Sequence, residues 1–249
     1  VFNKITGRFS VLEIADTTKN YLGQMVRSIY VESDSIIFAG TQTLGVVRIN
    51  VKLRTATVYP LGTDNLYVRS IVEDSEKRCF FSTFGQGFFV RNKEGITKHY
   101  TIADSQTDPA RYDAINRVNQ VFKYDNVHYW IATERGIFDF NQNTDEITEI
   151  SLVPYTGLLP KAPQVRKILR DTRGHIWLAT YEGLLFLENG KIESGYFFKS
   201  IEDDGFSLSS NRLSDVFEDA GGSIWISNFD MGVNVLHTID VRFNYVSKN

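Results

Sequence analysis

Apolar and polar residues alternate along this chain at the short spacing of β-strands, and one such pattern occurs five times. Its clearest copy spans residues 165–186. The copies begin at an apolar residue: Val26, Val68, Val118, Val165 and Leu213. Fifteen residues later each copy has a threonine or an asparagine: Thr41, Thr83, Thr133, Thr180 and Asn228. A repeat of this length is typical of a supersecondary unit that buries its apolar face by stacking on its neighbours.

Each repeat has the composition of β-strands. In the clearest copy, residues 165–171 and 174–180 are rich in branched and aromatic side chains, which favour half-buried strands. Asp171 and Gly174 predict a turn between them, because Asp can bond its own downstream backbone and Gly accepts a positive φ. Two further strands follow by residue 198. Four short antiparallel strands in about 45 residues are typical of a β-propeller blade.

We therefore predict an all-β fold of five complete four-stranded blades, starting near residues 26, 68, 118, 165 and 213, with almost no helix. Residues 1–12 resemble the end of a blade, with a tight turn before an outer strand. The last repeat continues through residues 233–236 and 241–245, which would supply its own outer strand. We expect one propeller domain over residues 1–249, a fragment of a larger propeller with five blades plus one orphan outer strand. A closed five-blade ring is the alternative, in which the orphan strand pairs with the last blade or stays unpaired.

The composition indicates a large buried core. Of the 249 residues, 42% are hydrophobic and 13% aromatic. The net charge is −3 and both signs are interspersed, which argues against a nucleic-acid partner. No apolar run approaches the roughly 18 residues that span a bilayer, so we expect no membrane insertion, and no signal-peptide pattern opens the chain. The single cysteine, Cys79, lies in a predicted strand and is expected to be a small core residue.

Residues 165–184 follow the pattern V-x-x-I-x-x-D-x-x-G-x-I-W-x-A-T-x-x-G-L, which resembles the two-component regulator propeller repeat. Residues 207–211, with the sequence SLSSN, and residues 218–225 resemble the linker and the following strands of the same family. The first two copies depart from the pattern at Phe38, Lys77, Arg78 and Phe80. The resemblance covers essentially the whole chain.

This resemblance implies the extracytoplasmic sensor region of a hybrid two-component system, a group found chiefly in gut Bacteroidetes, where many sensors respond to oligosaccharides. It implies a periplasmic segment of an inner-membrane protein, with an oligosaccharide as its small-molecule ligand and a homodimer of the full-length protein. The chain itself is expected to catalyse no reaction and to need no cofactor. Histidine kinase activity would lie elsewhere in the full-length protein.

Several repeated positions have a structural explanation. An aromatic residue stands three places before each Thr or Asn, and inside a strand it should pack between neighbouring blades: Phe38, Phe80, Trp130, Trp177 and Trp225. The Thr hydroxyl can bond a backbone group across the following turn. Asp74, Asp171 and Asp219 recur in the turns between first and second strands, where each has a local role. The four histidines, His99, His128, His175 and His237, lack the spacing of metal ligands, so no metal site is expected.

Two repeated positions are candidates for ligand contact. The residue after each Thr or Asn is Gln42, Phe84, Glu134, Tyr181 or Phe229. Phe84, Tyr181 and Phe229 could stack on sugar rings from the loop between the second and third strands, or cap the interfaces between blades. One residue into the first strand are Arg27, Arg69, Asn119, Arg166 and Ser214. Arg69 and Arg166 could bind a carboxylate or sulfate with forked hydrogen bonds, or pair with acids of neighbouring blades.

Two other classes of function stay open at the level of sequence. One is a propeller glycosidase or lyase. A glycosidase would need two carboxylates about 5–9 Å apart in the central cleft, and aspartates in strand-to-strand turns fit this requirement poorly. The other class is a protein-interaction scaffold with no small ligand.

Overall fold

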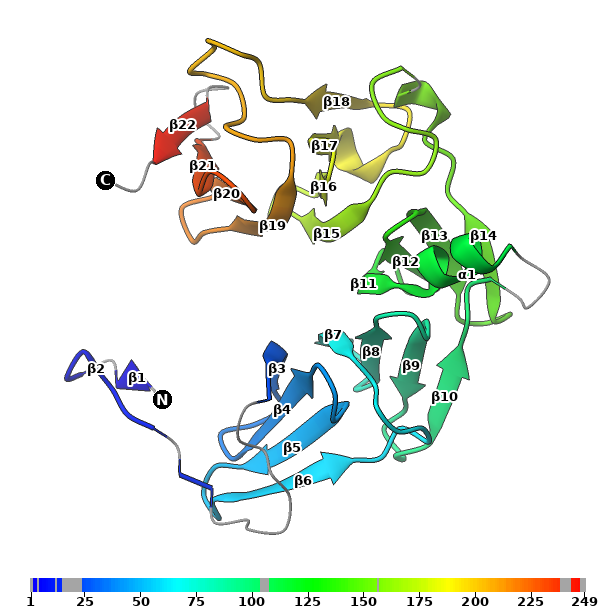
Figure 1. Ribbon diagram of the computed structural model, residues 1–249, viewed down its shortest axis with the longest axis vertical. Coiled ribbons are helices and arrows are strands. Elements are labelled where there is room, and N and C mark those ends of the chain that lie inside the picture. The colour runs from blue at the N-terminus through cyan, green and yellow to red at the C-terminus, as the bar shows by residue number, and fades with distance from the viewer. Residues whose placement is uncertain are drawn as a thin grey trace. The chain divides into compact units, whose positions relative to one another are not determined.

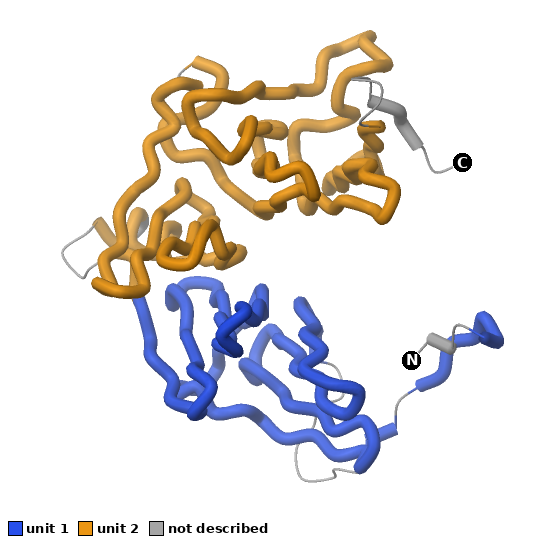
Figure 2. The backbone as a smooth tube through the Cα atoms, turned by 180° about the vertical axis from the view of Figure 1, so that it is seen from behind, with its two compact units in different colours: residues 1–100 blue, residues 101–249 orange. Residues whose placement is uncertain are grey.

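The protein divides into two compact units, residues 1–100 (unit 1) and residues 101–249 (unit 2) (Figure 2). The computed structural model describes residues 2–3, 5–11, 13–14, 24–103, 108–155, 157–237 and 243–246. For residues 2–3, 110 and 243–246 the description is limited to the backbone.

Unit 1 contains two four-stranded antiparallel sheets (Figure 1). The first consists of β3 (Val26–Val31), β4 (Ile36–Thr41), β5 (Val46–Asn50) and β6 (Thr55–Tyr59). The second consists of β7 (Val68–Glu73), β8 (Cys79–Thr83), β9 (Phe88–Arg91) and β10 (Thr97–Tyr100). Each strand pairs with the next along the chain, which is the topology of a propeller blade.

Unit 2 contains three sheets of the same topology. They are β11 (Val118–Lys123), β12 (His128–Thr133), β13 (Gly136–Asn141) and β14 (Glu146–Glu149); β15 (Val165–Arg170), β16 (Ile176–Thr180), β17 (Leu184–Leu187) and β18 (Gly195–Phe198); and β19 (Leu213–Glu218), β20 (Ile224–Asn228), β21 (Val233–Leu236) and β22 (Phe243–Val246). Three short helices lie in this unit: α1 (Pro109–Asn116), η1 (Val153–Tyr155) and η2 (Glu188–Gly190). No helix among the described residues has the length and apolar composition to cross a bilayer.

The five sheets confirm the predicted all-β fold of four-stranded propeller blades. Their first strands, β3, β7, β11, β15 and β19, begin at the predicted residues. Helix α1 was not predicted. It has eight residues and opens with Pro109, whose fixed φ suits the first turn of a helix. At its other end the buried Asn116 side chain accepts a hydrogen bond from the Ile102 N–H at 2.8 Å and donates one to the Tyr112 carbonyl at 3.0 Å.

The two ends of the chain carry the expected short strands. Near the N-terminus β1 (Phe2–Asn3) pairs with β2 (Arg8–Phe9) across a tight turn, in which Gly7 has a φ of 64°. The predicted orphan strand is therefore present as the second strand of a two-stranded hairpin. The outer strand predicted at residues 241–245 is β22, and residues 241–242 lie outside the described part of the chain. The same holds for residues 1, 4 and 12 of the predicted N-terminal segment.

The aromatic residue of each second strand is buried, with one exception. Phe38, Phe80, Trp130 and Trp177 are at most 5% exposed, as predicted. The exposed fraction of Trp225 is 40%, so the prediction is wrong at this position. Trp225 lies in the last sheet of unit 2, and among the described residues no further sheet follows that one along the chain.

The turns between second and third strands are closed by the repeated Thr or Asn, as predicted. Each threonine hydroxyl donates to the carbonyl of the following glycine, at 2.7–3.0 Å. Asn228 accepts backbone N–H groups of the same turn through its Oδ1. The glycine of every turn has a positive φ, from 66° to 141°, which explains why no other residue type occurs there: Gly45, Gly87, Gly136, Gly183 and Gly232.

Candidate functional site

A β-bulge stands at the start of the first strand of every blade. The register of pairing with the second strand shifts at one residue: Arg27, Arg69, Asn119, Arg166 and Ser214. A bulged residue is left out of the pairing ladder, and the local kink can re-aim its side chain. The candidate arginines Arg69 and Arg166 are therefore bulge residues, a feature that the sequence did not reveal.

A backbone hydrogen bond brings a third repeated position to the bulge. In each blade, the N–H of the residue after the Thr or Asn donates to the carbonyl of the residue that precedes the first strand, at 2.9–3.2 Å. The accepting residues are Met25, Tyr67, Arg117, Gln164 and Arg212. This position was not predicted from the sequence. The antiparallel pairing of the first two strands could have identified it. That pairing continues by one residue on each strand, so that the residue after the Thr or Asn lies opposite the residue before the apolar start of the repeat.

In unit 1 the three positions form a cluster of arginine and aromatic side chains. The guanidinium carbon of Arg69 lies 4.2 Å from the ring centre of Phe84 and 5.5 Å from that of Tyr67. The two rings are 5.3 Å apart. Arg27 lies 5.5 Å from the Tyr67 ring and donates to the Gln42 side chain. The predicted residues Arg69 and Phe84 are thus in direct contact.

In unit 2 the same positions of two adjacent blades form what is here called the unit 2 cluster: Arg166, Tyr181, Arg212 and Phe229. The Arg166 guanidinium lies 5.2 Å from the Tyr181 ring centre and 5.4 Å from that of Phe229. The two rings are 5.8 Å apart. Arg212 lies 4.9 Å from the Tyr181 ring and donates a hydrogen bond to the Tyr181 hydroxyl oxygen. The structure therefore brings the three predicted residues of this unit together.

Carboxylates border the unit 2 cluster on both sides. Glu134, from the neighbouring blade, lies 3.4 Å from Arg166 and 3.2 Å from Arg117. Asp230 lies 2.9 Å from Arg212. The hydrogen bond to Tyr181, together with the Asp230 carboxylate, raises the pKa of the Arg212 guanidinium. Arg166 thus pairs with an acid of the neighbouring blade, which was the structural alternative for this residue, while its guanidinium also faces two aromatic rings.

The aspartates of the strand-to-strand turns have the local roles predicted for them. Asp171 accepts the backbone N–H groups of Arg173 and His175, and Asp219 accepts those of Gly221 and Ser223. Asp74 accepts two backbone N–H groups and pairs with Arg78. Within the described ranges, no group of three or more His, Cys, Asp or Glu residues has the arrangement of a metal site.

Comparisons with known proteins agree with this fold. No protein-family model matches the chain. The curated protein "Histidine kinase P4" of Formosa agariphila is 22% identical over 242 residues, which are 94% of this chain and 17% of that protein. This chain thus spans less than a fifth of the relative's length.

Solved structures resemble the chain over most of its length. An extracellular domain of a hybrid two-component system from Bacteroides thetaiotaomicron has a TM-score of 0.70 at 17% identity, covering 95% of this chain and 30% of its own. A second such domain has a TM-score of 0.65 at 17% identity, covering 84% and 27%. Virginiamycin B lyase from Staphylococcus aureus has a TM-score of 0.60 at 14% identity, covering 91% and 86%. These similarities place the chain among the β-propellers.

Proposed function

We propose that this chain is the ligand-sensing part of a hybrid two-component signalling protein, that it lies in the periplasm, and that its ligand is an oligosaccharide. Its likeness to the extracellular domains of two such systems supports this proposal, as does its likeness to a protein named as a histidine kinase. Histidine kinase activity would belong to other parts of the full-length protein.

The unit 2 cluster is the observation that carries the proposal. Phe229 is 53% exposed and Tyr181 is half-buried, so aromatic surface is available to the apolar face of a sugar ring. Arg166 and Arg212 offer guanidinium N–H donors to hydroxyl or acidic groups of the same ligand. Aromatic surface with a few convergent polar groups is typical of small-molecule sites. Arg69 and Phe84 would supply an equivalent contact in unit 1.

The sensing role requires binding and no reaction. A ligand shifts a signalling equilibrium only by binding one of two states more tightly than the other. In the full-length protein those two states would be arrangements of a homodimer, and the ligand would favour one of them.

A lyase is the second candidate, because one of the structures that resemble the chain is virginiamycin B lyase, whose histidine-to-alanine variant is described as catalytically inactive. In this chain His99 lies in β10, His128 lies in β12, and His175 and His237 flank the ends of β16 and β21. None of the four occupies a bulge position or a neighbour of one in the register of the blades. A histidine-dependent reaction at the unit 2 cluster is therefore disfavoured.

Calorimetry of the intact protein against a panel of glycan fragments tests the proposal. Heat of binding, with the fragment recovered unchanged, supports the sensor. Release of a cleaved product would indicate an enzyme. Absence of heat across the panel would favour an interaction scaffold. Arg166→Ala tests the assignment of the site, since it should weaken whatever binding is seen, whereas Arg173→Ala, an exposed arginine in a distant turn of the same blade, should not.

A further inference from the structure

Two adjoining cavities in unit 2 lie apart from the residues of the unit 2 cluster. One has a volume of about 420 Å³ and the other about 370 Å³, and both are lined by Glu149, Pro160 and Lys161. They are bounded by the end of β14, by residues 151–153 and 159–162 of the connection that follows it, and by side chains from α1 and the β12–β13 turn. Each volume is in the range of small-molecule pockets.

One end of this double cavity is cationic. Arg111 from α1, Arg135 from the β12–β13 turn and Lys161 from the connection line it together, and Glu149 is the only acid in the lining. Three cations and one carboxylate leave a formal charge of 3 − 1 = +2 in a protein whose net charge is −3. Guanidinium groups converging on one space match a planar carboxylate or a sulfate.

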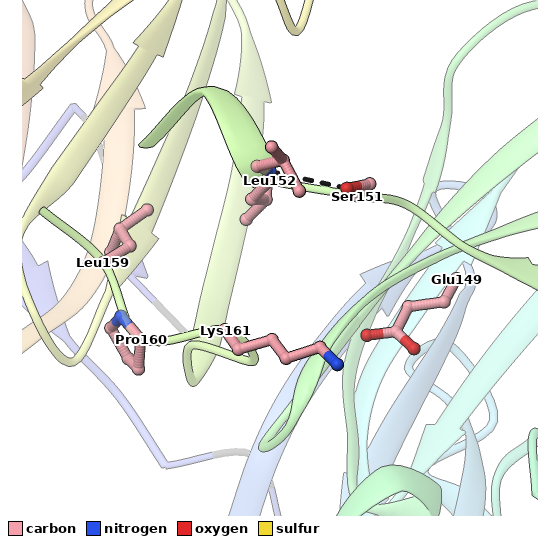
Figure 3. A pocket seen from close by; sticks show the side chains of 7 residues that line it. Glu149, Ser151, Leu152, Leu159, Pro160 and Lys161 are labelled. Carbon is pink, nitrogen blue, oxygen red and sulfur yellow. Dashed lines mark hydrogen bonds between the residues drawn. The ribbon is translucent and has the colours of Figure 1, made fainter. Parts of the chain in front are cut away.

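The other end is apolar. Leu152 and Leu159 are buried in the wall and belong to the core of unit 2. Figure 3 shows the Lys161 ammonium and the Glu149 carboxylate pointing toward each other, with Leu152, Leu159 and Pro160 farther along the cavity. A ligand with one apolar face and one acidic group would match both ends.

The wall of the cavity is held in place from several sides. The Tyr155 hydroxyl donates to the Ile192 carbonyl of the following blade at 2.9 Å. The Gly136 N–H donates to the Pro163 carbonyl at 2.8 Å, which fixes the connection to the start of β13. Asn116 fixes α1, as described above. A site whose walls are already ordered loses less conformational entropy on binding.

Arg111 has a weak competing partner in the lining of the cavity. Arg111 and Glu149 form an ion pair at 3.8 Å, and both side chains are largely exposed. Exposed pairs of this kind are worth little because water screens them. A carboxylate or sulfate entering the cavity could therefore replace the contact of Arg111 with Glu149 at small cost.

From these observations we infer that the double cavity binds an acidic sugar, with its carboxylate or sulfate at Arg111, Arg135 and Lys161 and its ring against Leu152 and Pro160. This inference rests on the proposed function and narrows the ligand from an oligosaccharide to an anionic one.

The test compares galactobiose, its sulfated form and digalacturonate by calorimetry on the intact protein. At least one of the acidic sugars should bind about tenfold more tightly than the neutral one, and the advantage should shrink as salt is raised. Lys161→Gln and Arg135→Gln should each weaken binding of that acidic sugar about five- to tenfold and leave neutral galactobiose unchanged. Glu149→Gln should strengthen binding of the acidic sugar. Arg173→Gln is the matched control and should change nothing.

The outcomes separate this inference from the proposed function. Equal affinity for the three sugars, or no effect of Lys161→Gln and Arg135→Gln, overturns the acidic site. If Arg166→Ala still weakens binding in that case, the sensor proposal stands. Absence of binding by all three sugars overturns the acidic site, and the proposed function is then decided by the wider glycan panel.

Discussion

The pair Asp171 and Trp177 shows how one repeated set of residues joins a turn to the space between two blades. The carboxylate of Asp171 accepts backbone N–H groups of its own turn through Oδ1, and its Oδ2 accepts the indole N–H of Trp177 at 2.9 Å. Asp219 and Trp225 repeat the arrangement at 2.8 Å, and this bond lowers the pKa of the Asp219 carboxyl. A buried Trp requires a partner for its N–H, and in the last two blades the aspartate of the turn supplies it.

Trp177→Ala should lower the free energy of unfolding by roughly 3–5 kcal/mol, because it removes a side chain that is only 5% exposed and leaves a cavity between blades. Denaturant unfolding followed by circular dichroism measures the loss. Trp225→Ala is the control. Its side chain is 40% exposed, so its loss should be clearly smaller. Equal losses of stability for the two variants would contradict the packing of Trp177 between blades.

Glu182 predicts a dependence of stability on pH. Burial raises the pKa of its carboxyl, and its buried Oε2 has no hydrogen-bond partner among the described residues. Because the folded-state pKa is raised, the protonated Glu182 carboxyl contributes to the free energy of unfolding. This contribution is complete below the unfolded-state pKa of about 4.3 and is lost as the pH rises through the folded-state pKa. Glu182→Gln should therefore be more stable than the native protein at pH 7, by less than about 1 kcal/mol.

Urea midpoints measured from pH 4 to pH 7 check this prediction, and the difference between Glu182→Gln and the native protein should vanish at the acid end. Glu188→Gln, on the exposed surface of the same blade, should show no such trend. A constant difference across the pH range would show that Glu182 is not the titrating group.

At the scale of residues, the repeat register was sufficient to select Arg166, Tyr181 and Phe229 as neighbours. It did not reveal that Arg212 joins them or that Glu134 pairs with Arg166. Those contacts form between side chains of different blades, and their existence depends on how two sheets pack. A register derived from one repeat contains no information on that packing. Whether these residues bind a ligand stays a prediction.

Among elements, the first strand of each blade has one edge that its own sheet leaves unpaired. An exposed edge is a liability because its N–H and C=O groups can pair with another chain. Between the first two blades of unit 2, side chains of β11 cover the edge of β15. The Asn119 amide donates to the Val165 carbonyl, and the Gln120 side-chain oxygen accepts the Ile168 N–H, both at 2.7 Å.

Gln120→Ala should therefore loosen β15 locally. The Ile168 N–H loses a buried partner, at a cost of about 1–3 kcal/mol, and its hydrogen exchange should accelerate. Amide exchange followed residue by residue measures the effect. The control is Lys167→Ala, which breaks only an exposed contact with Asp215 at 3.8 Å and should leave exchange nearly unchanged. Unaltered protection of Ile168 in Gln120→Ala would contradict the role of this side chain.

The strands could be predicted because branched and aromatic residues mark them and the repeat supplies five independent copies of the pattern. Helix α1 could not, because its eight residues, PARYDAIN, form no continuous apolar stripe. Its position depends on Asn116, whose hydrogen bonds to residues 102 and 112 give no periodic signal. The connections between blades are accordingly the least predictable elements. They contribute both Arg111 and Lys161 to the lining of the double cavity.

For the whole molecule, stability is distributed over similar blades. Units 1 and 2 each contain buried clusters formed between adjacent sheets. In a repeat array, the free energy of folding is approximately a sum over repeats and their interfaces. A substitution at one bulge position should therefore alter ligand binding at that blade without unfolding the others.

This separation leads to a prediction for signalling in the intact protein. Arg166→Ala and Tyr181→Ala should each shift the ligand dose–response to roughly five- to hundredfold higher concentration, because each removes a partner of the bound ligand. The maximal output should be retained, since the blades stay folded. A reporter of signalling output measures both quantities. Unshifted curves for both variants would place the ligand at another junction.

The bulge at the start of every blade has a consequence for how such proteins can diversify. Because Arg27, Arg69, Asn119, Arg166 and Ser214 stand outside the ladder of backbone pairs, a mutation there leaves the register of its sheet intact. Evolution can therefore change the side chain at this position in one blade at a time, and duplication or exchange of whole blades copies the bulge with its position. If these positions bind the ligand as proposed, a gene family with this architecture should acquire new ligand specificities by single substitutions, while the scaffold that presents them is inherited unchanged.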